Sequence, residues 1–356
     1  MKQKKILTCC IYVLFLLLIV AAFVVSDVII SKETIENVEK EDFLILKDEK
    51  EISSLLYDGI YVWVGGIDGV TIYNVETKEE VKKIEGLMLL YSAEMTKTPD
   101  GMIWIGHEDG LTGIMHNSLE NRIDFKYPDI PKGRVNTVEW DGEKLWIGTY
   151  NGAASLIPDE NSWKVESIYN KNSGLCSDSV NVICKTEDSI WFASYLDAKS
   201  GGISIVDNGE IKHITIEDGI PHPYITSMQY LGQEKMLVGT GYMDTGGLAL
   251  VEKIEDIYTV TDTFFMKDGI PGEKVRQVFL DSEGLLWITT EYDGILITDY
   301  KNNHLNKPLS GLYYTEKNGL SDNEIKCIVE TPQEYWLGGK YGLTVIPKSI
   351  INKKLP

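Results

Sequence analysis

One pattern occurs seven times along this chain and constrains its fold more than any other feature. Each copy has a turn with Asp or Gly, an apolar–Trp–apolar–Gly strand, a second short turn, a Gly and another apolar strand. The copies occupy residues 57–73, 99–114, 140–157, 187–206, 232–251, 281–298 and 332–346. Their central positions hold Trp63, Trp104, Trp146, Trp191, Leu237, Trp287 and Trp336. Repetition at a fixed register is typical of an array of small structural units.

The spacing of the copies indicates what each unit contains. Successive central positions lie 41 to 50 residues apart, which is room for four short strands. Asp-Gly and Asn-Gly pairs stand where hairpins must turn, and no copy shows the i, i+3, i+4, i+7 face of a helix. We therefore expect an all-β fold, a seven-bladed β-propeller with four-stranded antiparallel blades. The six tryptophans are expected to pack each blade against its neighbour.

The two ends of the repeat region predict how the ring closes. After the seventh copy only PKSIINKKLP follows, which leaves little room for a fourth strand. The segment 42–58 aligns with 264–281, so residues 43–47 resemble a fourth strand that stands before the first blade. We expect it to pair with residues 343–347 and close a propeller that spans 42–350. Closure removes the sheet ends that invite edge-to-edge pairing.

The N-terminal residues indicate a membrane segment. Residues 1–5 carry Lys2, Lys4 and Lys5, and residues 6–25 carry no charge. Twenty helical residues span about 30 Å, the thickness of the hydrocarbon core of a bilayer. The positive-inside rule then predicts a cytoplasmic tip at 1–5, a single signal-anchor transmembrane helix at 6–26, a stem at 27–41 and an extracytoplasmic propeller. A cleaved secretory signal ending near Val24 and Ser26 is the alternative, although its apolar region usually has about 7–15 residues.

Composition excludes several classes of function. With 54 acidic against 34 basic residues the formal net charge is −20, which disfavours a nucleic-acid partner. The five cysteines and five histidines show neither a disulfide framework nor metal-ligand spacing, so we expect no metal and no cofactor. No nucleophile elbow or phosphate-binding loop is present either, so the sequence indicates a protein that is not an enzyme.

Candidate ligand-binding residues lie in connections that a propeller gathers on one face around its channel. Two of these connections, 194–202 and 240–247, are longer than the others. They and their neighbours supply Tyr195, Asp197, His222, Tyr224, Tyr242 and Asp244, with Tyr150, Tyr292 and Tyr341 from further blades. Aromatic rings stack on sugars and carboxylates orient them, which predicts a site for carbohydrate or another neutral polar ligand. The alternative is that these tyrosines only shield turns.

The repeat also resembles a known family. The form D-G-x-[LI]-W-[IV]-G-T-x-x-G-[LI], preceded by connections such as DGIPHPYI (218–225) and DGIPGEKV (268–275), resembles the two-component regulator propeller repeat over about residues 42–347. This resemblance implies the outer sensor portion of a membrane receptor, often a hybrid histidine kinase that responds to oligosaccharides. The sequence shows no kinase, second membrane helix or immunoglobulin-like module. A separate sensor kinase or other membrane protein is therefore the expected signalling partner.

Three functions follow, in order of preference. The first is a membrane-anchored, extracytoplasmic sensor propeller that binds a ligand. The second is a propeller enzyme of the streptogramin B lyase type, which only Ile190-Trp191-Phe192 resembles and which would need a metal and a His/Glu pair. The third is a protein-interaction scaffold whose acidic surface recruits a basic partner.

Overall fold

The computed structural model describes residues 40–355 except 48, 92, 116, 117 and 161. The expected cytoplasmic tip and transmembrane anchor, and the stem as far as residue 39, lie outside the described residues. Within the described part of the chain, no helix has the length and apolar character needed to cross a membrane. Contacts divide the chain into Met1–Glu41 and Asp42–Pro356, and the strands of the described residues belong to the second unit.

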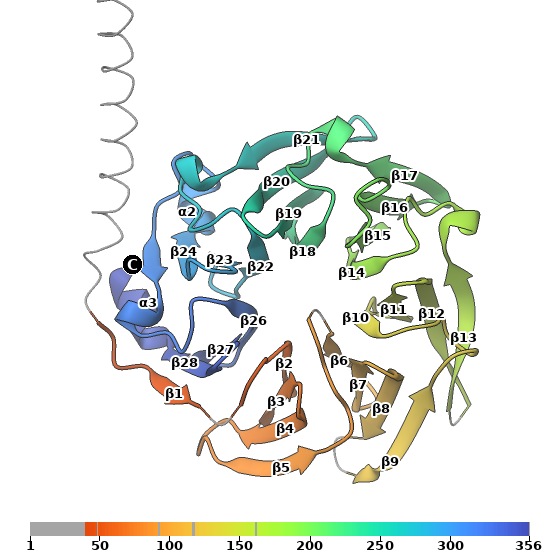
Figure 1. Ribbon diagram of the computed structural model, residues 1–356, viewed down its shortest axis with the longest axis horizontal. Helices are drawn as coiled ribbons and strands as arrows, with labels where there is room; N and C mark the ends of the chain where they lie inside the picture. Colours follow the sequence, from red (N-terminus) through yellow and green to blue (C-terminus); the bar gives the residue numbers. More distant parts are fainter. Residues whose placement is uncertain (1–39, 48, 92, 116–117, 161, 356) are drawn as a thin grey trace, which may run out of the picture. The chain divides into compact units, whose positions relative to one another are not determined.

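This second unit is a ring of seven four-stranded antiparallel sheets, as Figure 1 shows. The expectation of a seven-bladed β-propeller is therefore confirmed. From the inner strand outward, blade 1 contains β2 (Ser54–Tyr57), β3 (Tyr61–Gly66), β4 (Gly69–Asn74) and β5 (Glu80–Ile84). Blade 2 contains β6 (Met95–Lys97), β7 (Met102–His107), β8 (Gly110–Met115) and β9 (Ser118–Phe125). Blade 3 contains β10 (Val135–Trp140), β11 (Leu145–Thr149), β12 (Gly152–Asp159) and β13 (Ser162–Tyr169).

Blades 4 to 7 repeat the arrangement. Blade 4 contains β14 (Val180–Lys185), β15 (Ser189–Ser194), β16 (Ile203–Asp207) and β17 (Glu210–Ile214), and blade 5 contains β18 (Ile225–Gly232), β19 (Lys235–Tyr242), β20 (Thr245–Ile254) and β21 (Ile257–Phe264). Blade 6 contains β22 (Val275–Leu280), β23 (Leu285–Thr290), β24 (Ile295–Asp299) and β25 (Leu312–Tyr314). Blade 7 contains β26 (Ile325–Glu330), β27 (Glu334–Gly339), β28 (Gly342–Pro347) and β1 (Leu44–Leu46). Two short helices, α2 (Tyr300–Asn303) and α3 (Lys348–Lys354), follow β24 and β28.

Blade 7 takes its outer strand from the other end of the ring. β1 (Leu44–Leu46) pairs antiparallel with β28, with Leu44 opposite Val345 and Leu46 opposite Leu343. These pairs lie within the two segments that the sequence analysis expects to meet. The first and last parts of the propeller are thus held in one sheet.

Four connections into inner strands share one local structure. Each has a single 3₁₀ turn, at Lys171–Ser173, Ile216–Asp218, Met266–Asp268 and Glu316–Asn318. A glycine with positive φ follows each turn; at Gly219, for example, φ is 108°. Glycine adopts this conformation without the steric cost that a Cβ imposes. The next residue, such as Ile220, is then buried and holds the connection on the blades.

The repeated tryptophans lie between neighbouring blades. Trp63 shares an apolar cluster with Ile103 and Ile105 of blade 2, and Trp336 shares one with Val62 of blade 1. Their rings are almost fully buried. Burial of such large apolar surfaces stabilises each blade against the next and holds the inner strands in fixed positions around the channel.

Candidate ligand-binding site in the central channel

A cavity of about 1250 Å³ occupies the channel at the centre of the ring. Its wall comes from inner strands and from connections at one end of the channel, so it combines residues of all seven blades. Those connections meet on one face: Glu108 N–H, in a turn between second and third strands, donates to Met88 O, in the connection into blade 2. This face is the one on which the sequence analysis places the candidate site.

β-Bulges aim side chains into this cavity. In five inner strands the register shifts at the second residue, so that this residue has no partner directly opposite it. The bulged residues are Asn136, Asn181, Thr226, Arg276 and Lys326. All except Asn136 line the cavity. A bulge redirects the local chain, and here it repeats the same redirection from blade to blade.

Three tyrosines form a row on the side of blades 4 and 5. The ring of Tyr224 lies 5.1 Å from that of Tyr195 and 5.4 Å from that of Tyr242, measured between centroids. His222 extends the row, with its ring 4.9 Å from Tyr224. Burial lowers the pKa of His222 and raises the pKa of Tyr195 to about 12, so both side chains are neutral near pH 7.

Arg134 is clamped on another part of the wall. Its guanidinium carbon lies 4.7 Å from the ring centre of Tyr91 and 4.9 Å from that of Tyr150. It donates to Tyr150 Oη and to Asn136 Oδ1, and it approaches the Glu108 carboxylate at 3.4 Å. Cation–π contacts with two rings, together with these hydrogen bonds, hold this buried charge in place.

Blades 6 and 7 contribute a chain of alternating charges. Lys274 Nζ lies 2.6 Å from the Glu291 carboxylate, which also accepts from Arg276 Nη1 at 3.3 Å. Arg276 Nη2 lies 3.6 Å from Glu324, and Glu324 lies 3.7 Å from Lys326. Burial opposes ionisation of Glu291, but the charges of Arg276 and Lys274 outweigh it and lower its pKa. Glu291 is therefore ionised and orients both basic groups.

Two further acidic residues line the cavity: Glu94, directly before the inner strand of blade 2, and Glu139, on the inner strand of blade 3. Glu94 accepts from Thr137 Oγ1 at 2.6 Å and from Val138 N–H at 3.3 Å. Burial raises the pKa of Glu94 to about 7. Burial, followed by the nearby Glu94, raises the pKa of Glu139 to about 8. Near pH 7 Glu139 is therefore mostly protonated and Glu94 is about half protonated.

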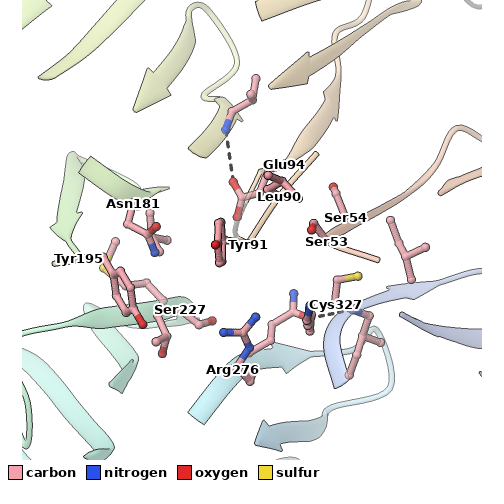
Figure 2. A pocket seen from close by; sticks show the side chains of 18 of the residues that line it. Ser53, Ser54, Leu90, Tyr91, Glu94, Asn181, Tyr195, Ser227, Arg276 and Cys327 are labelled. Atoms are coloured by element: carbon pink, nitrogen blue, oxygen red, sulfur yellow. Dashed lines mark hydrogen bonds between the residues drawn. The ribbon is translucent and has the colours of Figure 1, made fainter. Parts of the chain in front are cut away.

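Figure 2 shows how these groups face one another. In this view Arg276 points toward the middle of the cavity from one side and Glu94 from the opposite side, with Tyr91 between them. Tyr195 extends inward near Ser227. Thr226, on the inner strand next to that of Arg276, has a buried Oγ1 with no hydrogen-bond partner within the described residues. The wall thus offers ring faces, hydroxyl groups and charges to a ligand.

The structure separates the nine residues of the sequence-based hypothesis into three groups. Tyr150, Tyr195 and Tyr242 line the cavity, and Tyr224 and His222 adjoin them in the aromatic row. Four others do not line the cavity: Asp197, Asp244, Tyr292 and Tyr341. The exposed fractions of Tyr292 and Tyr341 are 55% and 61%.

Asp197 instead holds its own loop together. Its carboxylate accepts from Ser200 N–H at 3.0 Å and from Ser177 Oγ at 2.9 Å. The neighbouring connection of blade 5 also differs from the expected long loop. β19 and β20 continue through it to a tight turn, with Tyr242 opposite Thr245, because Gly241 and Gly246 allow the two strands to approach closely. This extension raises Tyr242 along the rim of the cavity.

Sequence reasoning missed the basic and acidic wall. The missed groups include Arg134, Lys274, Arg276, Glu291 and Lys326. One signal for them was present: the chain has only three arginines, Arg122, Arg134 and Arg276, and two of the three line this cavity. The second signal was the polar residue that recurs at the second position of five inner strands, where the bulges lie.

A second cavity of about 800 Å³ lies between blades 2 and 3. It is lined by Trp140 and Trp163, whose rings lie 5.9 Å apart, and by Arg122, which pairs with Asp124 at 2.9 Å. These two tryptophans stand outside the repeat register. Trp163 packs against Trp104 at 5.0 Å, which gives it a role in joining the two blades.

Among the described residues, no group of three or more His, Cys, Asp or Glu side chains is placed to hold a metal ion. The described cysteines, Cys176, Cys184 and Cys327, are free thiols. Burial raises the pKa of the Cys184 and Cys327 thiols to about 12, which disfavours the reactive thiolate form.

Comparisons with known proteins show the fold. No protein-family model and no curated protein matches the chain. Among solved structures, the extracellular domain of the hybrid two-component system protein BT3049 of B. thetaiotaomicron aligns with a TM-score of 0.64 at 18% identity, over 85% of this chain and 42% of that one. The corresponding domain of BT4673 aligns with a TM-score of 0.62 at 17% identity, over 87% and 40%.

The same fold serves proteins of very different kinds. A chain of the mitotic checkpoint complex aligns with a TM-score of 0.64 at 10% identity, over 87% of this chain and 95% of that one. The present chain spans less than half of the two bacterial extracellular domains. At these identities the likeness establishes a propeller architecture, and function has to be argued from the site.

Proposed function

We propose that this protein is an extracytoplasmic sensor propeller that binds a carbohydrate in the central cavity. The observation that carries the proposal is the cavity itself: Tyr91, Tyr150, Tyr195 and Tyr242 line it together with fixed hydrogen-bonding groups from several blades. Ring faces of this kind suit the apolar faces of sugars, and the polar groups suit their hydroxyls. The likeness in fold to bacterial extracellular domains supports an extracytoplasmic location.

The proposal includes how the binding event leaves the propeller. Residues 6–26 anchor the chain in the cell membrane, with the propeller on the outer side, and a separate sensor kinase or other membrane protein receives the signal. The sequence supports the anchor through its uncharged length and the lysines before it. Protease added to intact spheroplasts would digest the propeller under this topology and would leave it intact if the propeller faced the cytoplasm.

A binding experiment tests the function. The full chain in detergent micelles is screened against a library of oligosaccharides by thermal shift, and each hit is titrated by calorimetry. Tyr195→Ala and Tyr242→Ala should weaken binding of a hit by about tenfold or more, since each removes a ring face from the wall. Tyr341→Ala is the matched control, because Tyr341 lies outside the cavity wall and is 61% exposed.

Two results would contradict the proposed function. One is the absence of any saccharide that binds. The other is a saccharide whose affinity is the same in the wild-type protein and in both cavity variants, which would place its site elsewhere. Loss of binding only in Arg122→Gln would assign the ligand to the cavity between blades 2 and 3.

A further inference from the structure

The central cavity contains more basic groups than a site for a neutral sugar needs. Five basic residues line it: Arg134, Lys274, Arg276, Lys326 and Lys340. Five acidic residues line it as well: Glu51, Glu94, Glu139, Glu291 and Glu324. The formal charges balance only if all five carboxyl groups are ionised.

Two of those carboxyl groups bind protons in the neutral pH range. Burial raises the pKa of Glu94 to about 7 and the pKa of Glu139 to about 8, and the two carboxyl groups also repel each other's charge. Where these two groups are protonated, three other acidic residues, Glu51, Glu291 and Glu324, stand on the wall with five basic residues. Protonation of these two groups leaves basic residues in excess on the wall, inside a chain whose net charge is −20.

Arg276 is the best placed of these cations to meet a ligand. Its side chain projects inward from a bulge on β22, and Figure 2 shows it directed toward the middle of the cavity. Within the described residues it contacts two carboxylates, each through one nitrogen, at 3.3 and 3.6 Å. A guanidinium group has five N–H donors, so donors are left for a planar anion.

The surroundings of Arg276 complete a subsite. Lys274 and Lys326 lie on either side of it in the chain of charges, each next to a carboxylate that Arg276 also contacts. Thr226 stands at the equivalent bulge of the neighbouring inner strand and also lines the cavity. Tyr195 and Tyr242 line the adjoining part of the wall. An anionic group on a ring that stacks on tyrosine matches this arrangement.

We propose that the cavity binds an acidic saccharide, with the carboxylate of a uronic acid held by Arg276 and flanked by Lys274 and Lys326. This inference rests on the proposed function and narrows its ligand class. The sugar ring would lie against the tyrosines, and the carboxylate would lie against the bulge residues of blades 5 to 7. Recognition of a carboxylate by arginine combines charge with a matching fork of donors.

Matched ligands test the charge. The full chain in detergent micelles is titrated with trigalacturonate, a mannuronate trimer and a hyaluronan tetrasaccharide, and with the methyl ester of whichever acidic saccharide binds. The ester keeps the sugar and removes the charge. We expect the free acid to bind about tenfold or more tightly than its ester, and this preference to shrink as salt is added.

Matched variants test the residue. Arg276→Gln should weaken binding of the acid by about tenfold or more and change binding of the ester less than twofold. Arg276→Lys keeps the charge but loses the planar set of guanidinium donors, so its affinity for the acid should lie between those of the wild type and of Arg276→Gln. This variant also tests the inference if Arg276→Gln folds poorly. Arg122→Gln is the control, because it removes the same group from a half-exposed position outside this cavity.

The outcomes separate this inference from the proposed function. Binding of neutral oligosaccharides without binding of acidic ones would overturn the inference and leave the function standing, as would equal affinity for acid and ester. If a hexaglutamate peptide bound as tightly as the acidic saccharide, the cavity would respond to charge alone. That result would overturn the inference that its ligand is a saccharide. If no saccharide of either kind binds, the function fails as well.

Discussion

A single aspartate explains much of the repeated Asp-Gly…Trp pattern. Asp141 Oδ1 accepts from the backbone N–H groups of Glu143 and Lys144, at 2.8 and 2.7 Å, and so holds the turn between the first two strands of blade 3. Its other oxygen accepts from Trp146 Nε1 at 2.6 Å. Asp58 and Asp281 make the same contacts with Trp63 and Trp287. The carboxylate thus ties the turn to the ring that packs between blades.

We expect Asp141→Ala to destabilise the protein by about 1–3 kcal/mol, because it leaves a buried indole N–H and two backbone N–H groups without their acceptor. The melting temperature of the full chain, followed by circular dichroism, should fall by a few degrees. Asp68→Ala is the matched control, since Asp68 lies in an exposed turn, and it should change stability by less than about 0.5 kcal/mol. Equal effects of the two substitutions would contradict this role of Asp141.

Individual residues also show where sequence reasoning reaches its limit. Asp197 and Tyr195 are two positions apart in one loop, and the sequence analysis treats both as candidate ligand contacts. In the structure Asp197 accepts from Ser177 and from its own loop, whereas Tyr195 lines the cavity. The difference comes from Ser177, a residue 20 positions away that spacing within the loop does not reveal.

Neighbouring inner strands are linked by side chains as well as by apolar packing. Ser227 Oγ accepts from Val278 N–H at 3.0 Å, and Gln277 Oε1 accepts from Ile328 N–H at 2.7 Å. Glu94 occupies the same kind of position, because Oε2 accepts from Val138 N–H. A carboxyl group at this position accepts a hydrogen bond from a backbone N–H group of the next inner strand. Because the carboxyl group is buried, its ionised form is disfavoured.

The buried pair Glu94 and Glu139 gives stability a pH dependence of known sign. Their pKa values in the folded protein, about 7 and about 8, exceed the ordinary glutamate value of 4.5. The folded state therefore holds more protons than the unfolded state above about pH 4.5, and stability falls as the pH rises toward 8. Below pH 4.5 both states are protonated, and the penalty is absent.

We expect Glu94→Gln and Glu139→Gln to remove part of this decline. At pH 5 the free energy of unfolding of each variant should differ from that of the wild-type protein only by the effect of replacing a neutral carboxyl group with an amide. At pH 8.5 it should be higher than the wild-type value by about 1–2 kcal/mol. This difference is smaller than the full pKa shift would give, because water in the cavity screens the charge. Melting temperatures of wild type and variants between pH 5 and 9 measure this difference. Histidines titrate in the same way in both proteins, so their effect cancels when the two curves are subtracted. Glu80→Gln, on the exposed strand β5, is the control. Parallel pH curves for wild type and both cavity variants would contradict the assignment.

At the scale of the whole propeller, closure decides how the seven blades depend on one another. β1 pairs with β28 in blade 7, and Phe43 just before it packs edge-on against Tyr314 of blade 6, with ring centroids 5.3 Å apart. Phe43 is only 7% exposed, whereas the next residue, Leu44, is 42% exposed. The N-terminal strand is therefore held by both a sheet and an apolar contact.

We expect Phe43→Ala to destabilise the propeller by about 2–4 kcal/mol, and Leu44→Ala by less than 1 kcal/mol. Because the strand completes the ring, the loss should lower a single transition that tryptophan fluorescence and circular dichroism report at the same temperature. A separate early transition, with the rest of the signal unchanged, would show that blade 7 opens alone and that closure does not couple the blades.

The amino-acid sequence by itself determines the architecture of the propeller. Strand length, Gly-containing turns and the Asp–Trp pairs are local signals, and they recur in seven copies, so each copy supports the assignment of the others. The alignment of residues 42–58 with 264–281 likewise indicates which strands meet. These features depend on residues within one unit or on equivalent positions of two units, which a sequence displays directly.

Only the tertiary structure decides the character of the cavity. Arg134, Arg276 and Glu94 come from different blades, so their juxtaposition follows from closing the ring and from the bulges that turn side chains inward. Burial then raises the pKa of Glu94 and of Glu139 into the neutral range, which shifts the balance of charge on the cavity wall toward its basic residues. Charge in a site depends on the distances among all its groups and on their access to water, and neither is written in the order of residues.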